Sequence, residues 1–426
     1  MNVKQIKETA TYMLRSYPVI KKYVDEVEEL YAMTPMELKA RNEKKFIDLF
    51  QLAYTKSPFY HKLYTEAGIK IDDIQSIEDI VKLPIVTKDM IRGNSDSLLT
   101  CGKRFLISNH TSGTTGTPLA VYESWPALWR EQAYFVSYRK RCGFKYGEPL
   151  VSLRGALGGK DKLLKVGISN TLFLSSYNIN AGTADLYYQE ISKHKAKAIE
   201  GYPSSLYNLA LIFRDKGIEC NIPIAFTSSE SLLDYQRDLI EKVFHCQLFD
   251  HYGTTERTIR LEEDFNHDGY FEDPGYGIEE YHDGYILSTS LINEAFPLIR
   301  YKQYDIIKLK ENAESLSSRN FIKSIEGRNE DFVVCKDGTK LMGLGFVVKE
   351  VESLDISQIV QFEKGKVEIR LVSKKNVPDN ILKIVKNNME ERCGVGNMDV
   401  TVKQVDETGI EYTKKNKFKY IYSTVK

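Results

Sequence analysis

Apolar residues recur at helical spacing near the start of the chain. One face is formed, at positions i, i+3, i+4, i+7 and i+8, by Phe46, Leu49, Phe50, Ala53 and Tyr54. This spacing is typical of an amphipathic helix. Thr34, Pro35 and Glu37 form a capping box that predicts where the helix begins, and Ser57-Pro58 predicts where it ends. We expect its apolar face to pack on a larger body.

From about Ala196 the pattern changes to short apolar runs that alternate with amphipathic segments. Strands are predicted at 198–199, 222–226 and 247–249, with a helix at 232–244. The helix between the first two strands has one apolar face, made of Leu206, Leu209, Ala210 and Phe213. This alternation predicts a parallel sheet covered by helices. Polar segments at 227–230 and 250–256 follow successive strands, so we expect the ligand site at the carboxyl edge of that sheet.

After Arg328 the pattern favours short strands, at 359–362, 367–372 and 400–405, around one helix at 381–393. That arrangement is typical of a small α+β unit. The sequence therefore predicts an α/β protein of two domains. Residues 1–327 form a large N-terminal domain with helix-covered sheets, and residues 328–426 form a small, mobile C-terminal domain.

Composition narrows the class of protein. The 426 residues include 59 Lys+Arg and 59 Asp+Glu, a formal net charge of +0, which argues against nucleic acid as the main partner. No apolar run is long enough to span a membrane, and the first residues lack the apolar core of a signal peptide. The 6 cysteines are scattered and suit a reducing compartment. We therefore expect a cytoplasmic protein.

The segment Ser108–Pro118 contains the most specific chemistry. Residues 111–118 combine five hydroxyl side chains with two glycines, so side chains and backbone amides can both donate to phosphate oxygens. A Walker A loop is excluded because no Gly-Lys-Ser/Thr is present. Strands are predicted on either side, at 105–107 and 119–122, which makes the segment a candidate lid over phosphates. A surface turn rich in Ser, Thr and Gly is the alternative.

The order of residues in this loop, T-S-G-T-T-G-x-P, resembles the phosphate-binding loop of the adenylate-forming enzymes. Four further segments resemble motifs of the same superfamily and occur in the same order: Tyr252–Glu256, Pro297–Asp305, Gly327–Asp331 and Lys417. Within the superfamily, Ser57–Tyr60, Leu83-Pro84 and Thr87–Asp89 are similar to the phenylacetate-CoA ligase branch. The short chain and the Asp250-His251-Tyr252 context look most like the capsular-polysaccharide-associated members of that branch.

The resemblance implies a site for ATP. The β- and γ-phosphates would be held by Thr111, Ser112, Gly113, Thr114, Thr115 and Gly116. Tyr252 and Gly253 would lie against the adenine ring, with Ser229 and Glu230 as the other wall. Asp305 would accept hydrogen bonds from both ribose hydroxyls.

The resemblance also implies the catalytic groups and the cofactors. Thr255 would donate to the α-phosphate, and Glu256 would hold Mg²⁺. Lys417 would bridge the substrate carboxylate and the α-phosphate. Arg328, a further ATP contact, and Glu330 would form the hinge about which the small domain turns. The implied reaction joins a small carboxylic acid to AMP and then transfers the acyl group to CoA, a carrier-protein thiol or an amine, in surface polysaccharide synthesis.

Some positions depart from the superfamily pattern. Leu119 stands where many relatives have Lys, which removes one phosphate contact, and Gln303-Tyr304 replaces Thr-Gly before the aspartate. Asn416 replaces the usual Gly before Lys417, and Lys415 and Lys419 are rivals for the catalytic role. The second half-reaction therefore has weaker support than the first.

Other interpretations of the same residues stay open. One is transfer of AMP to a hydroxyl or carboxylate without a thioester, and another is a nucleotide-binding scaffold without catalysis. The histidines near His251 and Cys246 could form a zinc site, but their spacing is not that of a strong metal motif. The glycines of residues 154–160 could bind an anion or form a solvated turn. His251 could face the acyl pocket or serve only in packing.

Overall fold

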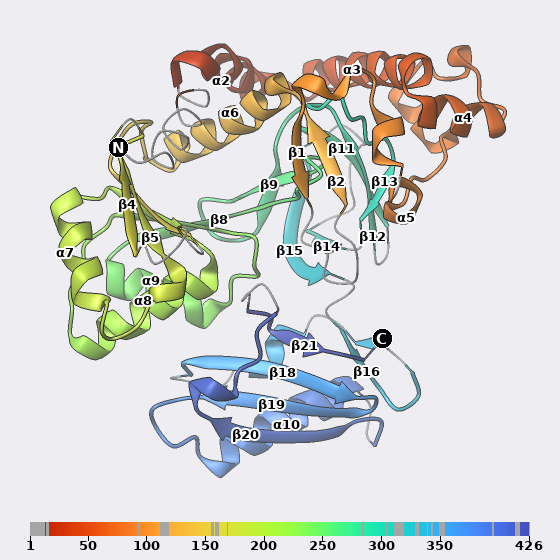
Figure 1. Ribbon diagram of the computed structural model, residues 1–426. Helices are drawn as coiled ribbons and strands as arrows, with labels where there is room; N and C mark the ends of the chain where they lie inside the picture. The colour runs from red at the N-terminus through yellow and green to blue at the C-terminus, as the bar shows by residue number, and fades with distance from the viewer. Residues whose placement is uncertain are drawn as a thin grey trace.

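A computed structural model describes residues 13, 17–92, 94–110, 119–154, 157, 162–167, 169–282, 285–303, 305–310, 319–328, 332–338, 340–341, 344–348, 354–393, 396–413 and 418–425. In Figure 1 the N-terminal helices lie at the top, the large sheet in the middle and the C-terminal strands at the bottom.

The N-terminal part is helical, as its apolar spacing predicts. It contains α2 (Tyr17–Ala32), α3 (Pro35–Lys56) and α4 (Pro58–Glu66). The capping box is confirmed, because the Thr34 side chain accepts from the Glu37 amide and the Glu37 carboxylate accepts from the Thr34 amide. The predicted end at Ser57 is also confirmed, and the Ser57 hydroxyl caps the following helix. Short elements complete this part: η1 (Ile71–Asp73), η2 (Ile77–Lys82), α5 (Lys88–Ile91), η3 (Ser95–Leu98) and η4 (Lys103–Phe105).

The described residues form a ten-stranded sheet, called here the large sheet. Its strands, in spatial order, are β14 (Asp305–Leu309), β15 (Phe321–Arg328), β10 (Tyr270–Glu272), β9 (Arg260–Glu263), β8 (Gln247–Gly253), β7 (Ile224–Ser228), β6 (Ala198–Gly201), β3 (Leu150–Arg154), β5 (Thr171–Ser175) and β4 (Leu163–Val166). Strands β5, β3, β6, β7 and β8 are parallel neighbours, and the flanking pairs are antiparallel. The predicted parallel sheet is therefore confirmed.

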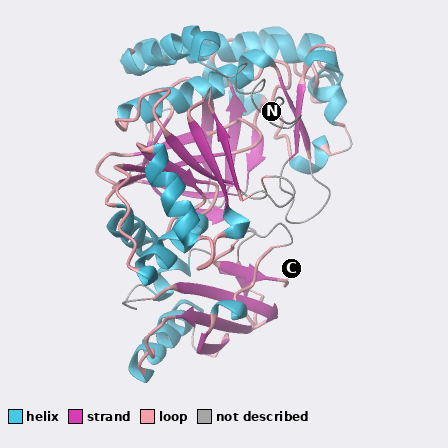
Figure 2. Ribbon diagram, turned by 60° about the vertical axis from the view of Figure 1, so that its left-hand side comes forward, coloured by secondary structure: helices cyan, strands magenta, loops and turns pink. Residues whose placement is uncertain are grey.

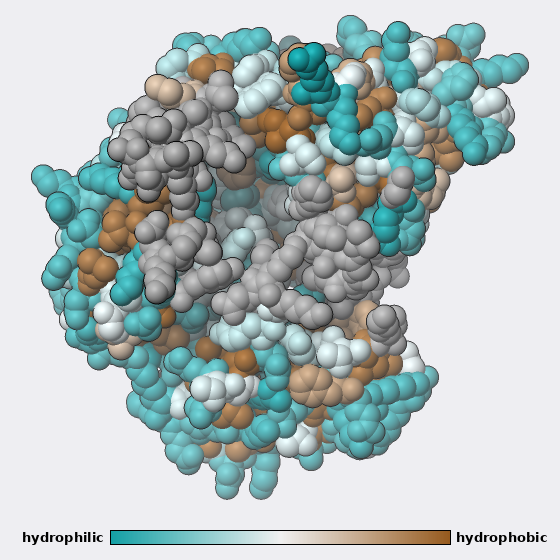
Figure 3. All heavy atoms as spheres, in the orientation of Figure 1, coloured by the Kyte–Doolittle hydropathy of each residue, from teal (hydrophilic) through white to brown (hydrophobic). Residues whose placement is uncertain are grey.

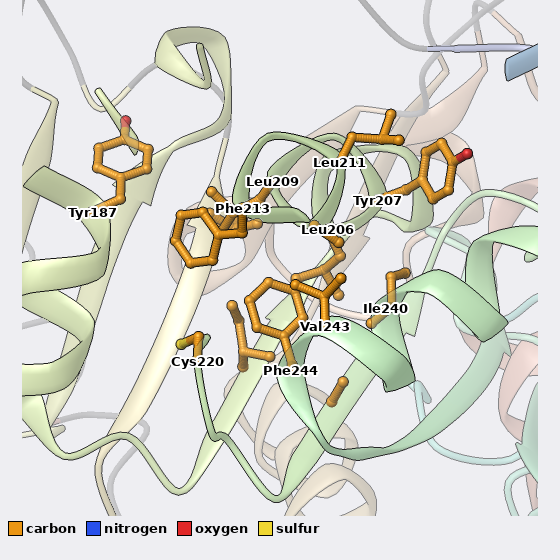
Figure 4. Close-up of a cluster of buried hydrophobic side chains, with 14 of the residues drawn as sticks. Tyr187, Leu206, Tyr207, Leu209, Leu211, Phe213, Cys220, Ile240, Val243 and Phe244 are labelled. Carbon is orange, nitrogen blue, oxygen red and sulfur yellow. The ribbon is translucent and has the colours of Figure 1, made fainter. Parts of the chain in front are cut away.

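Helices cover both faces of the large sheet (Figure 2). On one face lie α7 (Ala184–His194), α8 (Pro203–Lys216) and α9 (Asp234–Phe244), packed on a large apolar cluster. Figure 4 shows the side chains of α8 and α9 meeting there, with Leu206, Phe213 and Phe244 at the centre. On the other face α6 (Trp125–Arg141) packs through Tyr138 on Phe226 and Phe249. The apolar face predicted for α8 is fully buried.

Several predicted strand boundaries were wrong. Strand β7 begins and ends two residues later than predicted, and β8 extends to Gly253 instead of ending at Phe249. The polar end of β8 stays in the sheet because β9 pairs with it, with His251 opposite Glu262 and Gly253 opposite Arg260. The ladder with β9, together with the ladder with β7 as far as His251, overrides the polar character of these residues.

Two smaller sheets flank the large one. β1 (Ile107–His110) and β2 (Ala120–Glu123) form an antiparallel pair, with His110 opposite Ala120. They confirm strands on both sides of residues 111–118, although the first was predicted two residues too early, since Phe105 lies in η4. A three-stranded sheet consists of β11 (Gly277–His282), β12 (Tyr285–Ser290) and β13 (Tyr301–Gln303).

The C-terminal residues build the predicted mixture of strands and one helix. The elements are β16 (Val333–Val334), β17 (Lys340–Leu341), η6 (Leu344–Val348), β18 (Ile356–Glu363), β19 (Lys366–Val372), α10 (Asp379–Cys393), β20 (Asp399–Val405), η7 (Glu407–Gly409) and β21 (Ile421–Ser423). Within the described part, β20, β19, β18 and β21 form a four-stranded sheet with an apolar core of its own. No described helix is both long and apolar enough to cross a membrane.

Candidate active site

The carboxyl ends of β7 and β8 lie side by side, as the sequence predicts. The two strands are parallel, with Thr227 opposite Asp250 and Ser228 opposite His251. Ser229 therefore follows β7 next to the strand end that contains Tyr252 and Gly253. In the view of Figure 3 the surface is hollowed near the place where Figure 1 shows β8. The edge that the chain order predicts as the ligand site therefore borders a hollow on this side of the molecule.

Tyr252 and Asp305, 53 positions apart in the chain, meet at this edge. The Tyr252 hydroxyl donates a hydrogen bond to Oδ2 of Asp305. Asp305 is buried, begins β14 and lies opposite Arg328 of β15 in the antiparallel ladder. The structure therefore brings together Tyr252, Asp305 and the backbone of Arg328, three of the residues that the resemblance assigns to ATP.

Glu256 lies on the loop between β8 and β9, after the exposed Thr255. Its Oε1 accepts a hydrogen bond of 3.3 Å from the hydroxyl of Tyr301, a buried residue of β13. The Glu256 carboxylate is half-buried, and this hydrogen bond fixes the orientation of one of its oxygens. Mg²⁺ is usually bound by one or two carboxylates together with substrate phosphates. A single oriented carboxylate at the edge of the site fits that donor set.

A buried carboxylate connects this loop to the strands that flank residues 111–118. Glu123 of β2 accepts from the Asn109 amide of β1 at 2.5 Å and from Nε of Arg257 at 3.4 Å. Arg257 follows Glu256 directly and also donates to Glu131 of α6 at 2.8 Å. Its backbone is left-handed, with φ of 58°. The neighbouring carboxylates raise the pKa of Arg257, so it stays charged.

Ser229 and Glu230 occupy the exit of β7. Ser229 is left-handed, with φ of 69°, and its hydroxyl lies 3.4 Å from that of Ser228. The Glu230 carboxylate accepts at 3.1 Å from the Ser204 amide, at the first turn of α8. A carboxylate is favourable at a helix N-terminus, where amide groups lack intrahelical partners. Glu230 therefore has a clear structural partner, and its contact with adenine stays a prediction.

His251 lies on the face of the large sheet that α6 covers. Its ring centroid is 4.9 Å from that of Phe135, in an edge-to-face arrangement. Burial, together with the charges of Arg260 and Arg139, lowers the pKa of His251 well below its usual value, so the imidazole is neutral. The histidine packs against an aromatic ring and also lies one residue before Tyr252, so both interpretations of it stay open.

Several predicted residues lie outside the described part of the chain. They are the loop residues Thr111–Gly116, the hinge residue Glu330, the lysines Lys415 and Lys417, and the side chain of Arg328. Leu119, the residue that departs from the family pattern, is buried in the N-terminal apolar cluster. Among the described residues, no three His, Cys, Asp or Glu side chains are grouped to hold a metal ion, so nothing there supports the zinc interpretation.

Sequence reasoning missed Tyr301, Glu123, Asn109 and Arg257 as parts of the site. Tyr301 and Arg257 stand inside or next to motifs that were quoted, so their position was a usable signal. Asn109 likewise lies inside the quoted segment Ser108–Pro118, whereas Glu123 gave no signal, because pairing across the β1–β2 ladder brings it to Asn109.

Known proteins agree with this architecture, although no family model matches the chain. The chain is 27% identical to protein CapK of Staphylococcus aureus over 394 residues, which cover 88% of this chain and 87% of CapK. It is 23% identical to the phenylacetate-coenzyme A ligase of Escherichia coli (strain K12) over 356 residues, 77% of each chain. The crystal structure of 2-hydroxyisobutyryl-CoA ligase in its postadenylation state superposes with a TM-score of 0.73, over 92% of this chain and 90% of that one, at 16% identity.

The chain has the fold of an adenylate-forming ligase. The predicted resemblance is confirmed, since the homologues are CapK and phenylacetate-coenzyme A ligases. The motif Tyr252–Glu256 and the aspartate Asp305 therefore lie in an α/β architecture of the predicted type.

Proposed function

We propose that this chain is an adenylate-forming ligase. It joins a carboxylic acid to AMP with release of pyrophosphate and then transfers the acyl group to coenzyme A. The hydrogen bond between Tyr252 and Asp305, beside Glu256 at the carboxyl edge of β8, supports this assignment most directly. The similarity to phenylacetate-coenzyme A ligases supports coenzyme A as the acceptor. A carrier thiol and an amine are the other candidate acceptors.

In the first step a carboxylate oxygen of the acid attacks the α-phosphorus of ATP. The bond from that phosphorus to the bridging oxygen of the β-phosphate breaks, and pyrophosphate leaves with its electron pair. Negative charge gathers on the α-phosphate oxygens, so donors aimed at them lower the barrier. We assign the stabilisation of this charge to the hydroxyl of Thr255 and the ammonium of Lys417. The ammonium is a compact cation that can neutralise two anions as they approach each other.

Tyr252 and Asp305 bind the nucleoside end of ATP. The tyrosine ring lies against adenine, and the Asp305 carboxylate accepts from the ribose hydroxyls. The hydrogen bond from Tyr252 holds that carboxylate in one orientation before the nucleotide arrives. Such preorganisation lowers the entropic cost of binding. Ser229, Gly253 and Glu230 complete the adenine side, and residues Thr111–Gly116 bind the β- and γ-phosphates.

Glu256 is the residue that would hold Mg²⁺, which offsets phosphate charge during phosphoryl transfer. Tyr301 keeps one oxygen of the carboxylate oriented. Replacement of Glu256 by Gln therefore raises the Mg²⁺ concentration needed for half-maximal rate, whereas the Michaelis constant for the acid changes little.

We also propose that residues 328–426 move as a unit for the second step, with Arg328 and Glu330 as the hinge. That unit has its own apolar core and also packs against the large domain, because Ile356, Val372 and Ile410 belong to the same apolar cluster as α8 and α9. Tyr207 donates to the Leu354 carbonyl at 3.0 Å, and Arg214 pairs with Asp355 at 3.0 Å. Such a movement has to separate these apolar side chains and to break the ion pairs of Arg214 with Asp355 and of Lys374 with Asp215.

Pyrophosphate exchange into ATP, with a panel of carboxylic acids, tests the first step. Lys417→Ala should lower the exchange rate on the order of 10²–10³-fold, the usual loss for a group that stabilises transition-state charge. Lys415→Ala and Lys419→Ala are matched controls and should retain activity. Full activity of Lys417→Ala together with loss in one control would move the catalytic role to that lysine.

Mass spectrometry of the products, with and without coenzyme A, tests the second step. An acyl-CoA supports the proposal. A stable adenylylated product without a thioester would replace it by nucleotidyl transfer. Tight ATP binding without exchange for any acid would indicate a scaffold. The roles in surface polysaccharide synthesis and the cytoplasmic location stay predictions.

A further inference from the structure

A charged pair lies between α6 and the middle of the large sheet. Nη2 of Arg139, on α6, donates to Oε2 of Glu200, on β6. Glu200 stands opposite Phe226 of β7, one residue before the end of its strand. The Arg139 guanidinium lies 5.3 Å above the Phe226 ring and 5.8 Å above that of Phe135.

The pair is continuous with the candidate active site. Phe135 lies one helical turn before Arg139, so both project from the same side of α6. Another neighbour of Phe135 is His251, whose ring centroid lies 4.9 Å away, one residue before Tyr252. An aromatic ring therefore links the charged pair to the edge where adenine is proposed to bind.

The pair is more accessible than its surroundings. The side chains of Arg139 and Glu200 keep 24% and 22% of their exposure, whereas Phe226 and Phe249 beside them are buried. Glu200 uses one oxygen for Arg139, and its Oε1 has no hydrogen-bond partner among the described residues. The second carboxylate oxygen of Glu200 can therefore accept a hydrogen bond from a bound group.

We propose that Arg139 and Glu200 contact the acyl part of the substrate acid, and that this acid carries a hydroxyl group. The inference rests on the proposed function and names the class of its substrate. A hydroxyl can donate to the Glu200 carboxylate and accept from the Arg139 guanidinium at the same time. It is the smallest neutral group that satisfies both members of the pair.

Other acids fit this pair less well. An ammonium group would approach Glu200 but would also face the positive charges of Arg139 and Arg260, while a second carboxylate would be repelled by Glu200. A purely apolar acid would displace water from both charges without replacing its hydrogen bonds. A site built to bond a hydroxyl discriminates strongly against analogues that lack it.

A matched set of four-carbon acids tests the inference by pyrophosphate exchange. The set contains butanoate, 2-, 3- and 4-hydroxybutanoate, 4-aminobutanoate and succinate, and a second set pairs benzoate with the three hydroxybenzoates. One hydroxy acid should exceed its unsubstituted partner in kcat/KM by roughly 10- to 100-fold, since the bonds gained go to charged groups. The amino acid and the diacid should fall below butanoate.

Variants of the pair test whether these residues cause the preference. Glu200→Gln should lower the preference for the hydroxy acid over the unsubstituted acid at least tenfold, mainly through KM. The double variant Arg139→Met, Glu200→Met should remove the preference by making this part of the pocket apolar. Lys140→Gln, on the same helix in an exposed pair with Glu28, is the control and should keep the wild-type preference.

The outcomes separate the inference from the proposed function. Equal exchange with hydroxy and unsubstituted acids, or an unchanged preference in folded Glu200→Gln, overturns the inference and leaves adenylation intact. No exchange with any acid of either set overturns the proposed function, and the inference with it.

Discussion

The helices on the two faces of the large sheet pack through different kinds of interaction. On the face covered by α7, α8 and α9, alternate residues of the central strands are apolar, and Ile199, Ala225 and Leu248 pack with the helices in one large apolar cluster. On the face covered by α6, the strands next to the site present buried charges. Arg260, only 2% exposed, forms ion pairs with Asp273 and Glu262.

The charged face is built as a network. Glu262 also pairs with Arg141 of α6, and the Tyr31 hydroxyl of α2 donates to Asp273 at 2.5 Å. The Arg260 guanidinium lies 4.7 Å above the Phe135 ring. Burial of these charges is costly, and each is tolerated because it has an oppositely charged partner. The comparison shows that the apolar face provides stability, whereas the network fixes the positions of α2, α6 and β9 around the candidate site.

The largest expected effect is on the charged face. Arg260→Met leaves Asp273 and Glu262 buried without their shared cation, which should lower the free energy of unfolding by about 3–5 kcal/mol. Urea unfolding measures it. Lys140→Met removes an exposed pair from α6 and should cost less than about 1 kcal/mol. Equal effects of the two variants would show that the network contributes no more than a surface pair.

The apolar face should respond through lost packing alone. Leu209 is fully buried on α8, so Leu209→Ala should cost about 2–5 kcal/mol by leaving a cavity. The loss should be the same at pH 5 and pH 8, because no titratable group is involved. Leu186→Ala, at a position 36% exposed on α7, is the control and should stay within about 0.5 kcal/mol.

A smaller change tests whether the network acts as a unit. Tyr31→Phe removes the hydrogen bond to Asp273 and should cost about 1.5–3 kcal/mol, the range for bonds to charged groups. In the double variant with Arg260→Met the two losses should not add, because both act on Asp273. Strict additivity in a thermodynamic cycle would contradict a connected network.

One carboxyl of β8 should make stability depend on pH. Burial raises the pKa of Asp250 to about 7, although Thr227 and Tyr270 donate to it. The folded state then holds a proton that the unfolded state has lost, so the contribution of this carboxyl to stability is fully present below about pH 4 and is lost as the pH rises to about 7. The slope is at most about 1.4 kcal/mol per pH unit for one proton.

Melting temperatures of Asp250→Asn between pH 5 and pH 7 check this expectation. The variant should show a shallower decline than the unmodified chain, since the amide has no proton to lose. Asp48→Asn, at an exposed site on α3, should leave the decline unchanged. A decline of the same steepness in Asp250→Asn would assign it to Glu263, whose pKa burial also raises to about 7.

Local patterns in the sequence predicted the apolar face well. The helical spacing of Leu206, Leu209 and Phe213 requires only that one side of a helix be buried, and the capping box at Thr34 depends on residues three apart. The strand–helix alternation fixed the parallel order, and with it the edge where the site lies. These features follow from interactions within a few residues of each other.

Local sequence patterns could not predict the charged network or the contacts of the candidate site. Arg260 and Asp273 meet because β9 and β10 pair in one register, and Tyr31 reaches Asp273 across 242 positions of the chain. The extension of β8 to Gly253 depends on its pairing with β9. The local sequence does not indicate which charged residues will pair, because many charged residues could have formed these ion pairs.

Glu123 has a practical consequence for redesign of the enzyme. Its carboxylate joins Asn109 of β1 to Arg257, the neighbour of Glu256, so the strands flanking residues 111–118 and the loop that contains Glu256 share one buried anchor. A chimera that imports only residues 111–118 from a relative keeps this anchor. A chimera that replaces β1 or β2 should import Asn109, Glu123 and Arg257 together, because these three side chains are joined by hydrogen bonds.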